Sequence, residues 1–229
     1  IRDSTISDLS AAVTGILLAF NLPPELPFWM AAIGTFTAIV VVKCLFGGLG
    51  QNFANPAIVG RIVLMLSFTN AMTNWTLPLS LQTSDVTTGA TPLVSGNAEY
   101  LDLFLGKTGG CLGETCAIAL ITCGIYLVIR RIISPITPLF FLLTVEIFSI
   151  AAGFDPLYQI LSGGILLGAI FMATDYVTTP ITMWGKVIFG IGCGIITCII
   201  RFYASMAEGV SFSILIMNIL TPYLSLIHI

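Results

Sequence analysis

The chain has 229 residues, of which 57% are hydrophobic and 8% are charged, and its net charge at pH 7 is −3. Soluble domains carry about 25% charged residues, so this composition excludes an ordinary soluble domain and predicts a polytopic membrane protein. The few charges form no basic tract, which argues against a nucleic-acid partner. Six cysteines without a CxxC pair, together with one histidine, predict that the chain builds no metal site.

The sequence begins at Ile1 rather than at a methionine and carries no signal-peptide pattern. It stops inside an apolar run at Ile229. We therefore expect an internal piece of a longer protein that forms a single membrane domain over residues 1–229.

About eight hydrophobic segments follow one another, and several are short for helices that need about 20 residues to cross a bilayer. Short segments of this kind indicate re-entrant or broken helices, so the expected fold class is all-α. A polar interval at 72–110 separates the third segment from the fourth and is expected to be a loop outside the cytoplasm. The segments are Leu9–Leu22, Pro27–Val42, Ala54–Ala71, Cys111–Ile129, Ile136–Gly153, Leu157–Thr174, Val187–Ile200 and Val210–Ile229.

The orientation follows from the basic residues, which are enriched on the cytoplasmic side of membrane proteins. If the 72–110 loop is extracytoplasmic, alternation of the segments leaves only Lys107 and Arg201 outside. The tryptophans at 29, 75 and 184 fall near the ends of segments, where they are expected to anchor the membrane interface. The basic residues placed in the cytoplasm are Arg2, Lys43, Arg61, Arg130, Arg131 and Lys186.

Two interruptions of the apolar segments resemble each other, one at 46–57 and the other at 162–181. Each combines a Gly pair, small polar residues and a proline. Such interruptions in corresponding halves point to a central site in an inverted-repeat fold, and irregular backbone at that depth must be buried in protein or line a cavity. The alternative is that the two interruptions are similar by chance, because glycine and proline are frequent in membrane helices.

The 72–110 loop contains Asp-Val-Thr-Thr-Gly-Ala-Thr-Pro-Leu at 85–93. Gly89 and Ala90 leave room for a bulky group near the backbone, and Pro92 favours an extended Thr91. We therefore expect the Thr91 hydroxyl to project outward from a turn, where it could accept a phosphodiester-linked group. Asp85 could orient a donor or a metal ion during such a modification. From the residues alone, an ordinary Ser/Thr-rich loop is the simpler interpretation.

Thr88-Gly89-Ala90-Thr91 matches the Ser/Thr-Gly-Ala-Thr motif to which FMN is attached in two related families. These are the D subunit of the Rnf complex and the B subunit of the sodium-translocating NADH:quinone reductase. The wider loop sequence looks like the Rnf version, and the family's first helices are expected before Ile1. The architecture of these families resembles urea-transporter-like folds. Further blocks that resemble the family lie at 8–24, 46–57, 171–182, 190–197 and 208–218.

The resemblance implies FMN joined through a phosphoester to Thr91, with Thr88, Gly89, Ala90 and Asp85 around it, attached outside the cytoplasm by a flavin transferase. Thr91 would be an anchor and not a catalyst. The chain would be a multi-pass subunit of a prokaryotic cell membrane that relays electrons but is not catalytic alone. Flavin and iron–sulfur centres would lie in partner subunits C, G, E, A and B. The complex would couple ferredoxin:NAD oxidoreduction to Na⁺ or H⁺ translocation.

Three carboxylates are candidates for ion coupling, because ionisable residues inside a membrane are functional candidates by default. Glu146 lies within an apolar segment, Glu114 near the outer end of its helix, and Asp175 beside an irregular stretch. For Glu146 the alternative is a structural carboxylate hydrogen-bonded to a neighbouring helix or subunit. Asp175 could equally be a cap or boundary residue.

Asn52, Asn55 and Thr179 could bind a second, non-covalent flavin, either riboflavin or FMN, in a cavity between the broken helices. The alternative is that they cap the helix breaks. Two other functions remain open: the quinone-reductase B subunit, and a small-solute channel or transporter of urea-transporter-like fold. The motif at 88–91 argues against a channel, which has no need of it.

Overall fold

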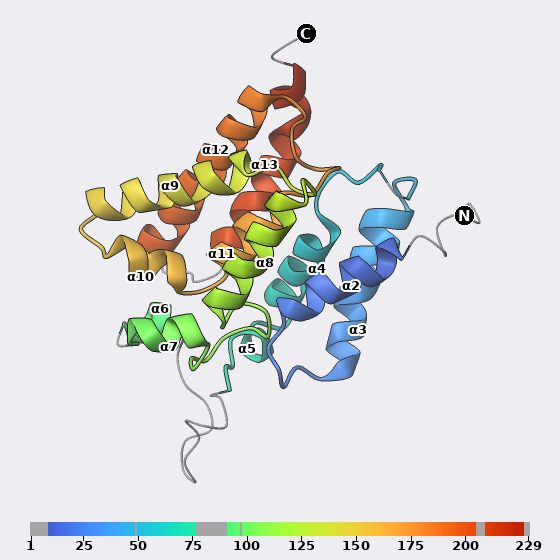
Figure 1. Ribbon diagram of the computed structural model, residues 1–229. Helices are drawn as coiled ribbons and strands as arrows, with labels where there is room; N and C mark the ends of the chain where they lie inside the picture. The colour runs from blue at the N-terminus through green and yellow to red at the C-terminus, as the bar shows by residue number, and fades with distance from the viewer. Residues whose placement is uncertain (1–8, 49, 77–90, 97, 205–208, 227–229) are drawn as a thin grey trace.

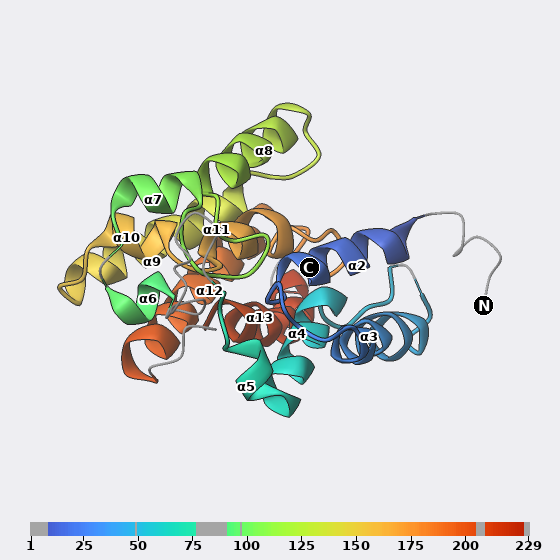
Figure 2. The same ribbon diagram turned by 90° about the horizontal axis from the view of Figure 1, so that it is seen from below.

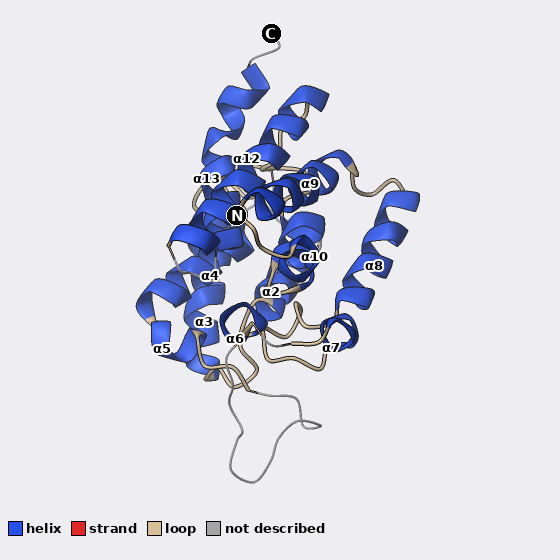
Figure 3. Cartoon of the chain, turned by 90° about the vertical axis from the view of Figure 1, so that its left-hand side faces the viewer, coloured by secondary structure: helices blue, strands red, loops and turns tan. Residues whose placement is uncertain are grey.

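The computed structural model describes residues 9–48, 50–76, 91–96, 98–204 and 209–226. Every regular element in these ranges is a helix, which confirms the all-helical prediction (Figures 1 and 3). The elements labelled η are π-helices. In chain order the helices are α2 Ser10–Phe20, α3 Phe28–Phe36, η1 Thr37–Cys44, α4 Pro56–Ser67, α5 Thr69–Met72, α6 Pro92–Ser95, α7 Tyr100–Leu105, α8 Ala117–Ile129, α9 Ile136–Ala151, α10 Pro156–Leu161, α11 Ile165–Leu167, η2 Gly168–Met172, α12 Met183–Tyr203 and α13 Gly209–Leu226.

Helix α12 has 21 residues and is the one described helix that is both long and apolar enough to cross a membrane. Six further apolar helices have 10–17 residues. The predicted segments correspond to helices, but several are interrupted. The segment 157–174 is divided into α10, α11 and η2, and the segment that starts at Cys111 becomes helical only at Ala117.

Helix α12 packs between α9 and α13 (Figure 1). Glycines on one face of α12 allow α9 to approach closely. A Cβ atom at Gly190 would lie 2.8 Å from the carbonyl oxygen of Thr137, and one at Gly194 would lie 2.6 Å from Cβ of Thr144. Small residues four positions apart are a common device for packing membrane helices without a hydrophobic driving force.

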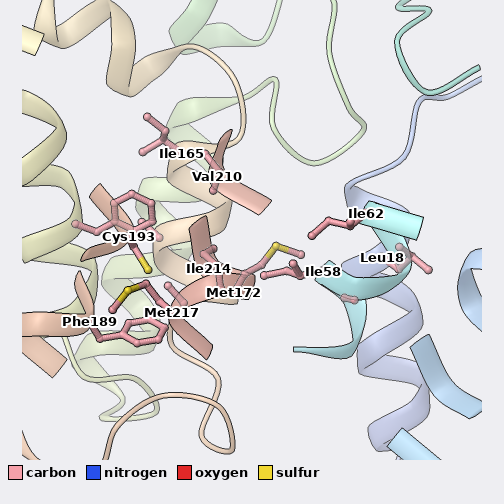
Figure 4. Packing of buried hydrophobic residues seen from close by; sticks show 14 of the residues in the cluster. Leu18, Ile58, Ile62, Ile165, Met172, Phe189, Cys193, Val210, Ile214 and Met217 are labelled. Atoms are coloured by element: carbon pink, nitrogen blue, oxygen red, sulfur yellow. The ribbon is translucent and has the colours of Figure 1, made fainter. Parts of the chain in front are cut away.

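One core cluster joins the two halves of the chain. Figure 4 shows Leu18 and Ile58 from the N-terminal half facing Met172 and Ile214 from the C-terminal half, with Phe189 behind them. The exposed fractions of all five side chains are 2% or less. The broken helices are therefore fixed by packing against each other rather than by their own length.

The two interruptions predicted from glycine and proline are real breaks, and they touch. The π-helix η1 precedes the first interruption and the π-helix η2 lies within the second, and such elements are frequently found at functional sites. The Asn55 side chain accepts hydrogen bonds from the backbone N–H groups of Ala57, at 3.0 Å, and Ile58, at 3.4 Å. Its Nδ2 donates to the carbonyl oxygen of Met172 at 3.2 Å. Asn55 thus caps α4 and connects one break to the other, as the capping alternative required.

Helix α8 lies at the edge of the molecule, as the views in Figures 2 and 3 agree. A groove of about 520 Å³ runs between α8 and the pair α9 and α10, and its lining residues are all apolar. Phe104, Ile125, Leu142 and Leu161 are among them. This apolar surface fits contact with lipid or with another membrane subunit.

Candidate functional site

Thr91 has the extended backbone that the following proline predicts, with φ −61° and ψ 155°, and Pro92 begins α6. The expectation that its side chain projects outward is wrong, because Thr91 is only 5% exposed. Two contacts draw the loop inward. The Tyr158 hydroxyl donates to the carbonyl oxygen of Pro92 at 2.7 Å, and Leu93 packs against Gly163 in the turn between α10 and α11.

The buried Oγ1 of Thr91 has no hydrogen-bond partner among the described residues. A buried polar group without a partner costs about 1–3 kcal/mol. Such a group in a folded protein requires an explanation, and a ligand that occupies it is one of the few available. Thr91 therefore stands out on geometry as well as on sequence.

A small cavity of about 20 Å³ adjoins Thr91, and we call it the Thr91 pocket. It brings together side chains from distant parts of the chain, including two that the sequence had not associated with Thr91. Trp75 is one of them: it is 7% exposed, so its predicted interfacial position is wrong, whereas Trp29 and Trp184 are 56% and 66% exposed. The pocket is lined by Arg61, Trp75, Thr91, Leu93, Glu114, Gly163, Gly164 and Val210.

Arg61 is the second unexpected member of the Thr91 pocket, and it is 5% exposed. Its Nη1 donates to Oδ1 of Asn21 at 2.6 Å, and its Nη2 to Sγ of Cys111 at 3.5 Å. The prediction that Arg61 lies opposite the 72–110 loop is therefore wrong. The long side chain of Arg61 extends from the middle of α4 to the end of α2. The position of the residue along its segment therefore does not give the position of its charged group.

Glu114 was expected near the outer end of a helix, but it lies in an irregular turn before α8. The turn is tied to the end of α2, because the N–H of Gly113 donates to the carbonyl oxygen of Phe20 at 2.8 Å. Glu114 is 8% exposed, and its Oε1 accepts a hydrogen bond from the N–H of Cys111 at 3.1 Å. The carboxylate is thus held inside the Thr91 pocket.

Two tyrosines brace the outside of this region. Tyr158 holds Pro92, and Tyr100, in α7, donates a hydrogen bond from its hydroxyl to Asp155. This hydrogen bond lowers the pKa of Asp155 below its ordinary value of 3.8, with help from the backbone N–H groups of Tyr158 and Leu157. The same hydrogen bond is the main reason that the pKa of Tyr100 is raised above 10.0.

A second, larger cavity of about 470 Å³ lies at the two helix breaks, and we call it the break hollow. Within it, Oδ1 of Asn52 is buried and has no hydrogen-bond partner among the described residues. A cavity of about 160 Å³ shares Asp175 with the hollow and adds Thr179 and Lys186. The polar residues that line the break hollow are Ser10, Thr14, Lys43, Asn52, Asn55, Thr174, Asp175 and Tyr176.

Thr179 and Asp175 have structural partners at the second break. The Thr179 hydroxyl donates to the carbonyl oxygen of Ala173 at 2.9 Å, and the Thr178 hydroxyl donates to Asp175 at 3.0 Å. The Thr179 hydroxyl therefore has a structural partner at the break, as the Asn55 side chain does. Of the three residues considered for a second flavin, Asn52 is the one whose side-chain oxygen has no partner within the described ranges.

The chain matches the model of the NQR2, RnfD, RnfE family over residues 2–228. It belongs to this family. The chain is 48% identical, over 95% of its own length and 70% of the relative's, to the D subunit of the Na(+)-translocating ferredoxin:NAD(+) oxidoreductase complex of Acetobacterium woodii. It is 42% identical, over 95% and 72%, to the D subunit of the proton-translocating ferredoxin:NAD(+) oxidoreductase complex of Clostridium ljungdahlii. It is 39% identical, over 94% and 73%, to the D subunit of the ion-translocating oxidoreductase complex of Stutzerimonas stutzeri.

In this family member, the residues considered for the two flavins lie in different places. Thr91 lies in its own pocket, whereas Asn52, Asn55 and Thr179 lie at the breaks. Thr88, Gly89, Ala90 and Asp85 fall outside the described residues.

Glu146 lies apart from both cavities. It is exposed on α9 beside Leu143 and Ile147, and it has no hydrogen bond or ion pair with a described residue. A carboxylate on an apolar face of a membrane-embedded helix requires a neighbouring subunit or water.

Proposed function

We propose that this chain is the D subunit of an Rnf-type complex and carries FMN joined through a phosphoester to Thr91. The complex would couple ferredoxin:NAD oxidoreduction to translocation of Na⁺ or H⁺, and this chain would be its electron-relaying membrane subunit. The buried, unpartnered Thr91 hydroxyl at the end of the Thr-Gly-Ala-Thr motif is the observation that carries the proposal. The oxidoreductase reaction and the translocated ions in this proposal are those stated in the relatives' names.

The residues present fit the phosphate end of FMN. The Thr91 oxygen is available for an ester, and Gly163 and Gly164 add no side chains of their own to the pocket. The cavity of about 20 Å³ is too small for a flavin ring, so the ring would lie beyond the residues that line it. The flavin, when bound, supplies the redox chemistry. The chain would supply the anchor, with Thr88, Gly89, Ala90 and Asp85 next to it.

A second, non-covalent flavin, riboflavin or FMN, would occupy the break hollow. The volume of about 470 Å³ lies within the range of small-molecule sites, which is about 300–1,000 Å³. The buried Oδ1 of Asn52 would accept a hydrogen bond from this ligand. Asn55 and Thr179 would shape the site through the backbone that they brace.

The membrane arrangement is part of the proposal. The Thr91 loop would be extracytoplasmic, because Lys43, Arg130, Arg131 and Lys186 still outnumber the basic residues at the Thr91 end after Arg61 is moved there. The two breaks, each with a π-helix beside or within it, support an inverted repeat of urea-transporter-like architecture.

The C, G, E, A and B subunits of the complex would be the partners. Of the residues considered for ion coupling, exposed Glu146 is available to such a neighbour. Glu114 and Asp175 have the partners described above.

The experiment is the mass of the peptide that contains Thr91, isolated from native membranes. We expect an addition the size of FMN that is absent in Thr91→Ala. An unmodified peptide from the native membrane would remove the covalent flavin from the account and restore the channel alternative.

A further inference from the structure

The turn between α10 and α11 lines the Thr91 pocket, and two guanidinium groups lie close to it. A Cβ atom at Gly163 would lie 2.9 Å from Nη2 of Arg201. A Cβ atom at Gly164 would lie 3.0 Å from Oε2 of Glu114 and 3.8 Å from Nη1 of Arg61. Both arginines come from helices distant in sequence, so the tertiary fold places them together here.

The two arginines differ in what they do at this turn. Arg201 donates from Nη1 to the carbonyl oxygen of Gln159 at 3.1 Å and from Nη2 to that of Ser162 at 3.4 Å. These bonds hold the backbone of the turn. Arg61 instead lines the Thr91 pocket itself, with Nη1 bonded to Asn21.

Hydroxyl groups on both sides of the turn lack partners. Oγ1 of Thr91 and Oγ of Ser162 are both buried without a hydrogen-bond partner among the described residues. Ser162 is 1% exposed and Thr91 is 5% exposed. Thr91 and Arg61 line the pocket together with Gly163 and Gly164, and Ser162 directly precedes these two glycines.

The charges favour an anion in this space. Arg61 and Arg201 contribute two positive charges, whereas Glu114 contributes one negative charge: its Oε1 accepts a hydrogen bond from the N–H of Cys111 and its Oε2 lies beside Gly164, so the net charge at the turn remains positive. A phosphodiester carries one negative charge at neutral pH. A guanidinium group binds phosphate oxygens through paired N–H donors, which are stronger than neutral hydrogen bonds.

We propose that Arg61 is the residue that holds the phosphate of the group carried on Thr91, with the Ser162 hydroxyl as a second donor. This inference rests on the proposed flavin ester. Arg61 is a positioning residue: it fixes the phosphate and hence the direction in which the rest of the cofactor leaves Thr91. Arg201 shapes the turn that receives the phosphate. Trp75 and Leu93 line the same small cavity, so binding of the phosphate would require one of these side chains to move.

The experiment compares the flavin-modified fraction of the Thr91 peptide in purified complexes that carry Arg61→Gln, Arg61→Lys or Asn21→Ala. Arg61→Gln should lower the modified fraction about tenfold, the effect of losing one charge-assisted contact. Arg61→Lys should restore part of it, because lysine keeps the charge but not the paired donors. Asn21→Ala removes the hydrogen-bond partner of Arg61 and keeps the guanidinium group, so the modified fraction should stay near that of the wild type.

A second measurement separates phosphate binding from folding. Arg61→Gln should lower the unfolding temperature less in the unmodified Thr91→Ala background than in the flavin-loaded protein, because the phosphate contact is already missing from that background. An equal decrease in the two backgrounds would overturn this inference, because Arg61 would then act on the fold and not on the phosphate.

The flavin-modified fractions can also contradict this inference. Equal loading in Arg61→Gln and the wild type would overturn this inference and leave the flavin ester intact. Equal losses in Arg61→Gln and Asn21→Ala would also overturn it, because Arg61 would then only connect α4 to α2. An unmodified wild-type peptide would overturn the ester and this inference together.

Discussion

The Thr91 pocket and the break hollow both arise where helices are interrupted, yet they are built in opposite ways. The Thr91 pocket measures about 20 Å³ and surrounds one buried hydroxyl with charged groups. The break hollow measures about 470 Å³ and has a mixed polar and apolar lining. A covalent anchor requires one well-placed oxygen and little volume, whereas a ligand held only by shape and hydrogen bonds requires the volume. Under the proposed function, the first region would hold the covalent cofactor and the second a dissociable one.

The largest expected effect comes from Gly163→Ala. Gly163 has φ +67°, and a Cβ atom there would lie 2.6 Å from Cδ1 of Leu93. A non-glycine residue in this conformation costs about 1–3 kcal/mol, and the contact would also push the Thr91 loop away from its pocket. We expect a severalfold loss of flavin from the Thr91 peptide, measured by mass spectrometry.

Gly50→Ala is the matched control for that substitution. Gly50 also has a positive φ, +86°, but a Cβ atom there would meet nothing within 4 Å. It should therefore impose similar backbone strain without affecting the Thr91 pocket. Equal flavin loss in the two variants would show that general instability, and not the contact with Leu93, is responsible.

Asn55→Ala should act on the break hollow instead. The substitution removes the N-cap of α4 and the link to Met172, which should lower the free energy of unfolding by about 1–2 kcal/mol. We expect loss of non-covalent flavin on gel filtration while the covalent flavin remains. Asn55→Ser keeps a side-chain oxygen that can cap α4 and loses the donor to Met172, so its effect should be smaller. Loss of the covalent flavin in Asn55→Ala would contradict the separation of the two regions.

Glu146→Gln tests a residue outside both regions. Because Glu146 is exposed on α9 and has no partner among the described residues, the chain itself should fold normally without its charge. We expect a severalfold decrease in ion transport into vesicles with unchanged flavin loading at Thr91. Unchanged transport would remove Glu146 from the ion-coupling candidates.

The smallest effect concerns the brace outside the Thr91 pocket. Because hydrogen bonding lowers the pKa of Asp155, its contribution to stability is present above pH 3.8 and is lost as the pH falls through the lowered value. The raised pKa of Tyr100 gives the opposite sign: its contribution is present below pH 10.0 and is lost as the pH rises through the raised value. Tyr100→Phe should slightly reduce the dependence of the unfolding temperature on pH in both the acidic and the alkaline range. Identical unfolding curves for Tyr100→Phe and the wild type would show that the Tyr100–Asp155 contact does not contribute to stability.

The sequence predicted features that depend on local chemistry. Glycine and proline located both helix breaks, and the uninterrupted apolar run ending near Ile200 predicted the core of α12. Pro92 predicted the backbone of Thr91. Each of these follows from residues adjacent in the chain.

The features that the sequence could not predict depend on tertiary contacts. Thr91 is buried because Tyr158 and Gly163 receive its loop. Arg61 reaches the same pocket because Asn21 accepts its guanidinium group, and Trp75 is buried there rather than at a membrane interface. An arginine within an apolar segment was the one available signal, since a buried charge requires a partner.

The most direct measurement is the mass of the Thr91 peptide from wild-type, Gly163→Ala and Asn55→Ala complexes after denaturation. The account predicts an FMN-sized addition in the wild type and in Asn55→Ala, and a much reduced modified fraction in Gly163→Ala. An unmodified wild-type peptide would contradict it, as would an addition lost in Asn55→Ala and retained in Gly163→Ala.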